Sequence, residues 1–227
     1  LFFLFRLLMS NKNSENYLKE LICTIGKSLF ERGLTHGSTG NISAITDNGD
    51  LLITPTGESL GRLLPEQICK ITKSNRLIGL HQPTKELFLH KAFYEKNNKK
   101  VGAVVHLHST YSVAYSMMPG LDEDNVFFPF TPYSIMLLGK VKLLPFYLPG
   151  DPKLGEKIKG IASKRSAVLL ANHGPVVAGK NLENATNAIE ELENTAKLAM
   201  LTRGLSPNLL SNEQVMDVVK KFNVDWD

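Results

Sequence analysis

Apolar residues recur along this chain with two alternating spacings, one typical of helices and one typical of strands. Apolar side chains three or four positions apart predict helices over four segments: Ser14 to Gly33, the residues that follow Thr84, Asn184 to Thr202, and Asn212 to Phe222. Short runs of alternating or continuous apolar residues predict strands in GNISAIT, DLLITPT, ICKIT, GAVVHLH, AVLLANHG and PVVAG. The pattern therefore predicts an α/β fold.

Turn residues indicate how some of these elements are connected. An Asp-Asn-Gly-Asp turn is expected to join the first two strands into a hairpin, and a turn with His173 and Gly174 is expected to join the last two. Ser109 and Thr110 are expected to cap a short helix that follows GAVVHLH. No internal repeat or low-complexity linker divides the chain, so the elements are expected to share one fold.

Length and composition indicate one globular domain. The 227 residues are 43% hydrophobic and 21% charged, with a formal net charge of +4, which is ordinary for a soluble protein. We expect a single domain over residues 9–227, with Met9 as the native start. Residues 1–8 form an apolar extension that is too short to span a membrane and is not expected to join the fold.

Charge and cysteine content narrow the class of protein further. The mild charge, without a dense Lys/Arg cluster, argues against a nucleic-acid partner. Cys23 and Cys69 are the only cysteines, too few for a disulfide framework and not at metal-ligand spacing. Reduced thiols and a cytoplasmic enzyme without a membrane partner are therefore expected.

Two histidines one residue apart, His106 and His108, stand at the end of the run GAVVHLH. Successive side chains of a strand point to opposite faces, so a His-x-His pair presents both imidazoles on one side, close enough to bind one cation. The motif is short, and an isolated pair at a strand edge is equally consistent with no metal at all. A third ligand is needed to favour a metal site.

His173 is the third ligand candidate, because it too follows an apolar strand and is followed by a glycine that lets the backbone bend. Taken alone, it is also explained as a histidine in a capped turn. Beside His106 and His108, the metal interpretation is favoured. Three neutral imidazoles around an open coordination position suit a catalytic zinc ion, since water or substrate must take the remaining position.

Five short motifs then follow one another in a fixed order: TGNIS, ITPTG, Pro-Thr-Lys-Glu at the start of a helix, HLH and ANHG. In this order and spacing, from about Gly33 to Gly204, the chain resembles the class II aldolase/adducin family. The resemblance implies an α/β/α sandwich with a mostly antiparallel central sheet and one Zn²⁺ ion per subunit. It also implies a homotetramer with active sites at the subunit interfaces.

The resemblance assigns roles to individual residues. Glu86 matches the catalytic acid/base of the family, which also binds the metal when substrate is absent. The residues that match the zinc ligands are His106, His108 and His173. The residues that match the segments around the substrate phosphate are Asn41, Thr56, Gly57, Thr84 and Lys85. Such segments suit a phosphate group, because N–H groups in a glycine turn and at the start of a helix attract an anion.

Three further residues have alternative explanations. Lys85 stands where the aldolases have a small hydroxyl residue, so it suits a substrate that bears both phosphate and carboxylate, although a lone lysine is also typical of a solvated surface. Tyr133 resembles the catalytic tyrosine that aldolases contribute from a neighbouring subunit, and is equally explained as a packing aromatic in a Pro-rich loop. His90 is either a residue that supports the site or a buried, hydrogen-bonded histidine.

Within the family, the segments TPTGESLGRL, HLHSTYSVA, LPGDP and ANHGPVVAG are similar to those of the 3-oxo-tetronate 4-phosphate decarboxylases. The resemblance implies a zinc-dependent lyase that converts this phosphorylated sugar acid to dihydroxyacetone phosphate and CO2 through a metal-stabilised enediolate. Aldol cleavage of a deoxyketose 1-phosphate of the fuculose- or rhamnulose-phosphate type makes the same enediolate, so an aldolase is the alternative. A non-catalytic adducin-like module is disfavoured, because the histidines and Glu86 are all present. Stereochemistry and the native metal stay open.

Overall fold

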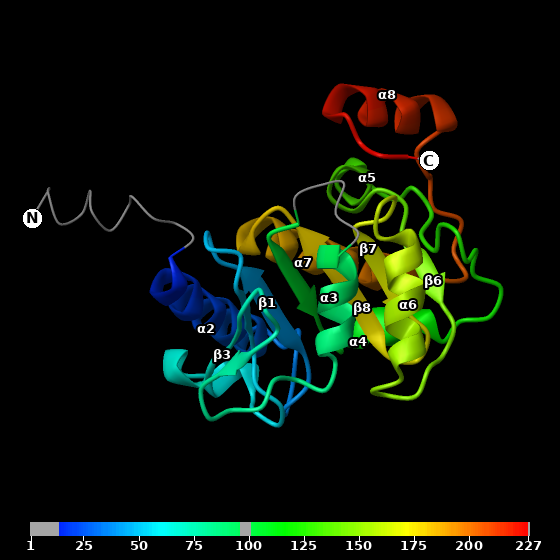
Figure 1. The fold of residues 1–227 in the computed structure, drawn as a ribbon. Helices are drawn as coiled ribbons and strands as arrows, with labels where there is room; N and C mark the ends of the chain where they lie inside the picture. The colour runs from blue at the N-terminus through cyan, green and yellow to red at the C-terminus, as the bar shows by residue number, and fades with distance from the viewer. Residues whose placement is uncertain (1–13, 96–100, 227) are drawn as a thin grey trace, which may run out of the picture.

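The fold is built around one eight-stranded sheet. The computed structural model describes residues 14–95 and 101–226, and in them the strands lie in the order β4-β3-β2-β1-β5-β8-β7-β6 (Figure 1). Neighbouring strands are antiparallel except β6 and β7, which are parallel. The strand bounds are β1 Asn41–Ile45, β2 Leu51–Ile53, β3 Cys69–Ile71, β4 Leu77–Ile78, β5 Ala103–His106, β6 Lys142–Leu144, β7 Ala167–Leu170 and β8 Gly174–Gly179.

Helices cover both faces of this sheet. In β5, the side chain of Val104 packs with α3 and α6, whereas its neighbours Ala103 and Val105 pack with α2 and α7. Because successive strand residues point to opposite faces, the sheet separates two hydrophobic cores, and the predicted α/β/α sandwich is confirmed. The helix bounds are α2 Glu15–Glu31, α3 Leu87–Glu95, α4 Thr110–Ser116, α5 Pro132–Leu138, α6 Pro152–Ile161, α7 Leu182–Leu201 and α8 Asn212–Phe222, with short 3-10 turns at Leu60–Arg62 and Pro65–Gln67.

Most elements predicted from hydrophobic spacing are present near their expected bounds. The first and last expected helices are α2 and α8, the long helix is α7, and the two expected hairpins are β1–β2 and β7–β8. The spacing does not reveal the short elements β4, β6 and α5, or the ten-residue helix α6, all of which are partly exposed. The predicted extension, residues 1–8, lies outside the described residues, so the domain boundary stays a prediction. No helix in the described part of the chain is both long and apolar enough to cross a bilayer.

Two expectations about the ends of elements near the histidines are wrong in detail. Strand β5 ends at His106, so His108 lies just beyond it, although the N–H of Leu107 still donates to the carbonyl of Pro175 over 3.2 Å. Helix α3 begins one residue after Glu86, which therefore lies in the preceding turn rather than in the helix. His108 and Glu86 thus lie just outside a strand and a helix. Tertiary contacts, and not regular backbone hydrogen bonds, therefore set the positions of these two residues.

The start of α4 is capped from a distant helix rather than locally. Ser109 occupies the N-cap position, but its side chain forms no capping hydrogen bond, so the expected local cap is wrong. Instead, the carboxylate of Glu193 on α7 accepts the N–H groups of Tyr111 and Ser112, both over 2.8 Å. A carboxylate satisfies free N–H groups at a helix start and interacts favourably with the helix dipole. Helix α7 thereby anchors the segment that follows His108.

Candidate metal centre and active site

Four segments that are distant in the sequence place the candidate ligands together. His106 ends β5, His108 follows two residues later, His173 lies between β7 and β8, and Glu86 lies before α3. Antiparallel pairing of β5 with β8 aligns the ends of these strands. A side chain at Gly174 is excluded, because its Cβ would lie 2.2 Å from the carbonyl oxygen of the residue before His108.

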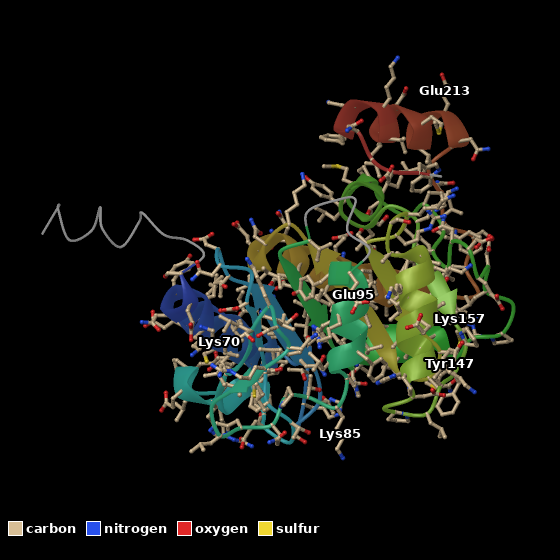
Figure 2. All side chains as sticks on the ribbon, in the orientation of Figure 1. Lys70, Lys85, Glu95, Tyr147, Lys157 and Glu213 are labelled. Carbon is tan, nitrogen blue, oxygen red and sulfur yellow. The ribbon has the colours of Figure 1, made fainter. Side chains whose placement is uncertain are left out.

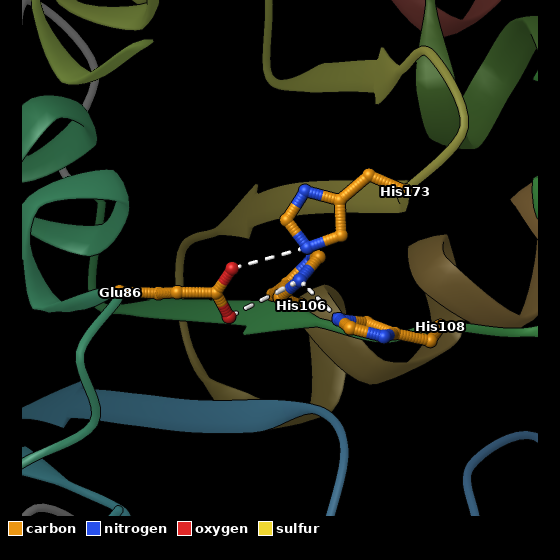
Figure 3. A group of neighbouring side chains, drawn as sticks. All are labelled: Glu86, His106, His108 and His173. Atoms are coloured by element: carbon orange, nitrogen blue, oxygen red, sulfur yellow. Dashed lines mark hydrogen bonds and ion pairs between the residues drawn. The ribbon is translucent and has the colours of Figure 1, made fainter. Parts of the chain in front are cut away.

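The four side chains form one compact group, drawn in Figure 3. The ligand atoms of Glu86, His106, His108 and His173 all lie within 4.8 Å of one another. The two carboxylate oxygens of Glu86 lie 3.1 Å from Nε2 of His173 and 3.4 Å from Nε2 of His106. Nε2 of His108 lies 3.1 Å from Nε2 of His106. The sequence prediction that these histidines come together is confirmed, and Glu86 joins them.

Hydrogen bonding decides which nitrogen of His106 faces this group. Its Nδ1 lies 2.8 Å from the carbonyl oxygen of Pro175, and a carbonyl can only accept, so Nδ1 carries the proton. Burial lowers the pKa of His106 despite the nearby carboxylate, which keeps the ring neutral. Its Nε2 therefore presents a lone pair to the other ligand candidates, the arrangement that metal-binding histidines adopt.

The charges of the group also suit a cation. Burial, reinforced by the neighbouring histidines, lowers the pKa of His108 to about 3. Burial opposes ionisation of Glu86, but His106, His173 and a hydrogen bond from Asn41 outweigh it and hold the pKa of this carboxyl well below its usual range. Imidazoles beside an ionised carboxylate are a donor set that binds divalent transition metals. The residues present therefore fit a catalytic metal ion.

The metal group opens onto a cavity of about 860 Å³. All residues predicted to bind the substrate phosphate line it, as do the predicted ligands with exposed surface: Asn41, Thr56, Gly57, Thr84, Lys85, Glu86, His108 and His173. Tyr133 lies on α5, is 61% exposed and does not line this cavity in its own chain. Its segment forms a short helix and not the Pro-rich loop that the sequence suggested.

The side chain of Asn41 has a different contact from the one expected at a phosphate site. Its amide Nδ2 donates to Oε2 of Glu86 over 2.8 Å and to Oγ1 of Thr84 over 3.2 Å. The register of β1 with β5 places Asn41 opposite His106, so the amide is held beside the metal group. Asn41 therefore contacts the candidate acid/base directly.

Sequence reasoning missed part of the cavity wall. The loop between β6 and α6 contributes Phe146 and Tyr147, and the loop before β1 contributes His36. The motif LPGDP lies in the first of these loops, and glycines surround His36. The sequence therefore predicts turns at both places, but no residue spacing there indicates that they line a binding site. Their contribution arises from the packing of loops against distant strand ends.

Comparison with known proteins agrees with this geometry. Residues 20–200 match the family model of the class II aldolase and adducin N-terminal domain. The chain belongs to the class II aldolase/adducin family. Membership covers most of the chain and every ligand candidate.

Individual relatives in this family differ in the reaction named for them. A 3-oxo-tetronate 4-phosphate decarboxylase of Escherichia coli O6:H1 is 46% identical over 187 residues, covering 82% of this chain and 88% of the relative. An L-fuculose phosphate aldolase of Methanococcus maripaludis (strain S2 / LL) is 35% identical over 181 residues, covering 80% and 95%. The crystal structure of YgbL from Escherichia coli matches with a TM-score of 0.87 and 41% identity, covering 90% of this chain and 98% of YgbL.

Removing one imidazole should abolish metal binding. We expect the purified protein to hold about one divalent metal ion per chain, and His106→Ala and His108→Ala each to lose most of it, because only two of the three imidazole ligands remain. Metal content of the folded variants, measured by elemental analysis, checks this expectation. His81→Ala, outside the group, is the matched control and should keep its metal. Stoichiometric metal in the double variant His106→Ala/His108→Ala would rule the site out.

Proposed function

We propose that this protein is a metal-dependent lyase that decarboxylates a 3-oxo-tetronate 4-phosphate to dihydroxyacetone phosphate and CO2. The observation that carries the proposal is the 46% identity to a decarboxylase of this name, in a chain that retains all four metal-ligand candidates. A phosphorylated sugar acid is therefore the proposed substrate class.

Two groups of residues that line the cavity suit the two ends of this substrate. Thr56 and Gly57 form a turn, in which Gly57 has a φ of 78° that favours glycine, and Thr84 and Lys85 lie just before Glu86, in the segment that leads into α3. We assign these residues to the phosphate, because turn N–H groups and an ammonium group attract an anion. The keto acid then lies toward Glu86 and the histidines, which line the same cavity.

Glu86 is the proposed acid/base. Loss of CO2 from a β-keto acid leaves an enolate, which must take up a proton on carbon. The carboxylate of Glu86 faces the cavity with 14% of its side chain exposed, so it can take up a proton from water and pass it to this carbon, or orient a water molecule that delivers it. A divalent metal ion, when bound, supplies Lewis-acid stabilisation of the negative charge on the ketone oxygen.

We propose Zn²⁺ as the native metal, on the strength of the three-histidine donor set. We further propose a homotetramer with active sites at subunit interfaces, as the family resemblance implies. The position of Tyr133 supports this arrangement. Tyr133 is well exposed and lies outside the cavity of its own chain. If Tyr133 is catalytic, it must therefore act in the active site of another subunit. Two cysteines without disulfide partners favour a reducing, cytoplasmic location.

A substrate assay tests the proposed reaction directly. Incubation with erythro and threo 3-oxo-tetronate 4-phosphates, made in situ, should release CO2 and dihydroxyacetone phosphate in equal amounts from one of them. The same preparation is incubated with fuculose 1-phosphate and rhamnulose 1-phosphate, from which an aldolase releases dihydroxyacetone phosphate without CO2. Product from a ketose phosphate alone would overturn the decarboxylase proposal in favour of an aldolase.

Glu86→Gln should separate the proton-transfer role from metal binding. The amide keeps the size of the side chain but cannot exchange a proton, so kcat should fall by about 10²-fold or more, while the three histidines retain the metal. Turnover and metal content are measured on the same preparation, with the exposed Glu20→Gln on α2 as control. Near-normal turnover would assign proton transfer to another group, with Tyr133 the next residue to test.

Lys85→Ser should weaken substrate binding more than turnover. Figure 2 shows the exposed side chain of Lys85 pointing outward from the fold. Lys85 also lines the cavity, where it can hold an anionic group that does not change during the reaction. Such binding is shared by ground and transition states, so KM should rise with a smaller change in kcat. Steady-state kinetics check this against Lys157→Ser, an exposed lysine on α6 outside the cavity. An unchanged KM would show that Lys85 is only a surface residue.

A further inference from the structure

A chain of hydrogen bonds leads from the interior of the protein to the candidate acid/base. Oε2 of Glu86 lies 2.8 Å from Nδ2 of Asn41, and Oδ1 of Asn41 lies 2.6 Å from Nε2 of His90. Nδ1 of His90 lies 2.7 Å from Oγ of Ser43, which in turn lies 2.7 Å from the hydroxyl of Tyr94. Five side chains are thus connected without an exposed intermediate.

Two regular elements place these five residues in contact. Asn41 and Ser43 are two residues apart in β1, so their side chains point to the same face of the sheet. Glu86, His90 and Tyr94 follow at intervals of four residues, through the turn before α3 and along one side of that helix. The strand and the helix therefore meet along one line of polar contacts between otherwise apolar cores.

The direction of every hydrogen bond in this chain follows from the amide of Asn41. Its NH2 group donates to Oε2 of Glu86 and to Oγ1 of Thr84, so the amide oxygen faces His90. That oxygen only accepts, so Nε2 of His90 carries a proton and donates. Burial lowers the pKa of His90 to about 3, with repulsion from His106 as a smaller cause, so the ring is neutral and its Nδ1 accepts.

The remaining two bonds are then determined as well. Ser43 must donate its single hydroxyl proton to Nδ1 of His90, and its oxygen must accept from the hydroxyl of Tyr94. His90 and Ser43 are fully buried, and Asn41 is only 4% exposed, so water cannot readily replace a missing partner. Reversing the Asn41 amide would set two acceptors against each other at the carboxylate, which is costly in a buried site.

We propose that His90 is a positioning residue, supported by Ser43 and Tyr94, that fixes the orientation of the Asn41 amide and so holds the Glu86 carboxylate in place at the metal centre. This inference rests on the proposed role of Glu86. His90 is neither one of the four ligand candidates nor a residue that lines the cavity, and it acts through Asn41. The tautomer of His90 reports the orientation of the Asn41 amide, because a ring that donates to the amide oxygen must carry its proton on Nε2.

Two substitutions at His90 distinguish positioning from packing. The amide nitrogen of Gln can replace Nε2 as a donor to Asn41, whereas Leu fills space but leaves the amide oxygen unpaired. In His90→Leu, kcat and metal affinity should fall by about 10- to 100-fold with little change in KM, and His90→Gln should recover most of the loss. Metal affinity is measured by competition with a chelator, and thermal unfolding shows that each variant is folded.

A second pair of variants keeps the test valid where His90→Leu fails to fold. Tyr94→Phe removes the hydroxyl at the far end of the chain and should lower kcat and metal affinity, although less than His90→Leu. Tyr115→Phe removes a hydroxyl that donates to the carbonyl of Val126 over 2.8 Å, and Tyr115 lies outside the cavity. This matched control should lose stability without any change in metal affinity.

The tautomer provides a readout that needs no substrate. Nitrogen NMR of the holoprotein with ¹⁵N-labelled histidine should show His90 as the neutral ring with its proton on Nε2. A proton on Nδ1, equal losses in His90→Gln and His90→Leu, or no loss in folded His90→Leu would each overturn the proposal. The ring signal and the chelator competition are independent of the reaction, so they test this inference even if the decarboxylase assay gives no product.

Discussion

The antiparallel pairing of β5 with β8 is the contact on which the candidate site depends. It aligns the end of one strand, which carries His106, with the turn that carries His173. The approach is so close that a side chain at Gly174 would collide with the adjoining backbone. Because backbone hydrogen bonds across the sheet set this distance, the strands themselves bring the imidazoles together, which lowers the entropic cost of assembling a site.

The Glu86 carboxylate organises the polar groups around this pairing. It faces His106 and His173 on one side and the amide of Asn41 on the other. An ionised carboxylate in a buried position is stable only with donors or cations around it. The Asn41 amide that donates to this carboxylate also accepts from His90. The buried hydrogen bonds of His90 and the charge of the candidate metal centre are therefore linked through Asn41.

This arrangement explains why one scaffold suits more than one reaction. Decarboxylation of a β-keto acid and aldol cleavage both leave an enediolate of dihydroxyacetone phosphate, and both require stabilised negative charge and a nearby proton donor or acceptor. The histidines and Glu86 serve these common needs. Discrimination must therefore come from the cavity wall, where Lys85 adds a charge and the loop with Phe146 and Tyr147 adds apolar surface. These positions lie on loops, which vary more readily than the strands that hold the ligands.

The sequence by itself determined the α/β class, most of the helices and hairpins, the three candidate ligands and the family, because hydrophobic spacing and short motifs are local properties. Only the tertiary structure decided that Glu86 lies before α3 rather than in it, that Glu193 caps α4, and that the side chain of Asn41, expected near the substrate phosphate, contacts Glu86. Sequence reasoning left the role of His90 open between support of the site and burial, and the structure shows that it is buried and bonded to Asn41. Each of these features is a hydrogen bond or packing contact between residues distant in the chain, which no local pattern encodes.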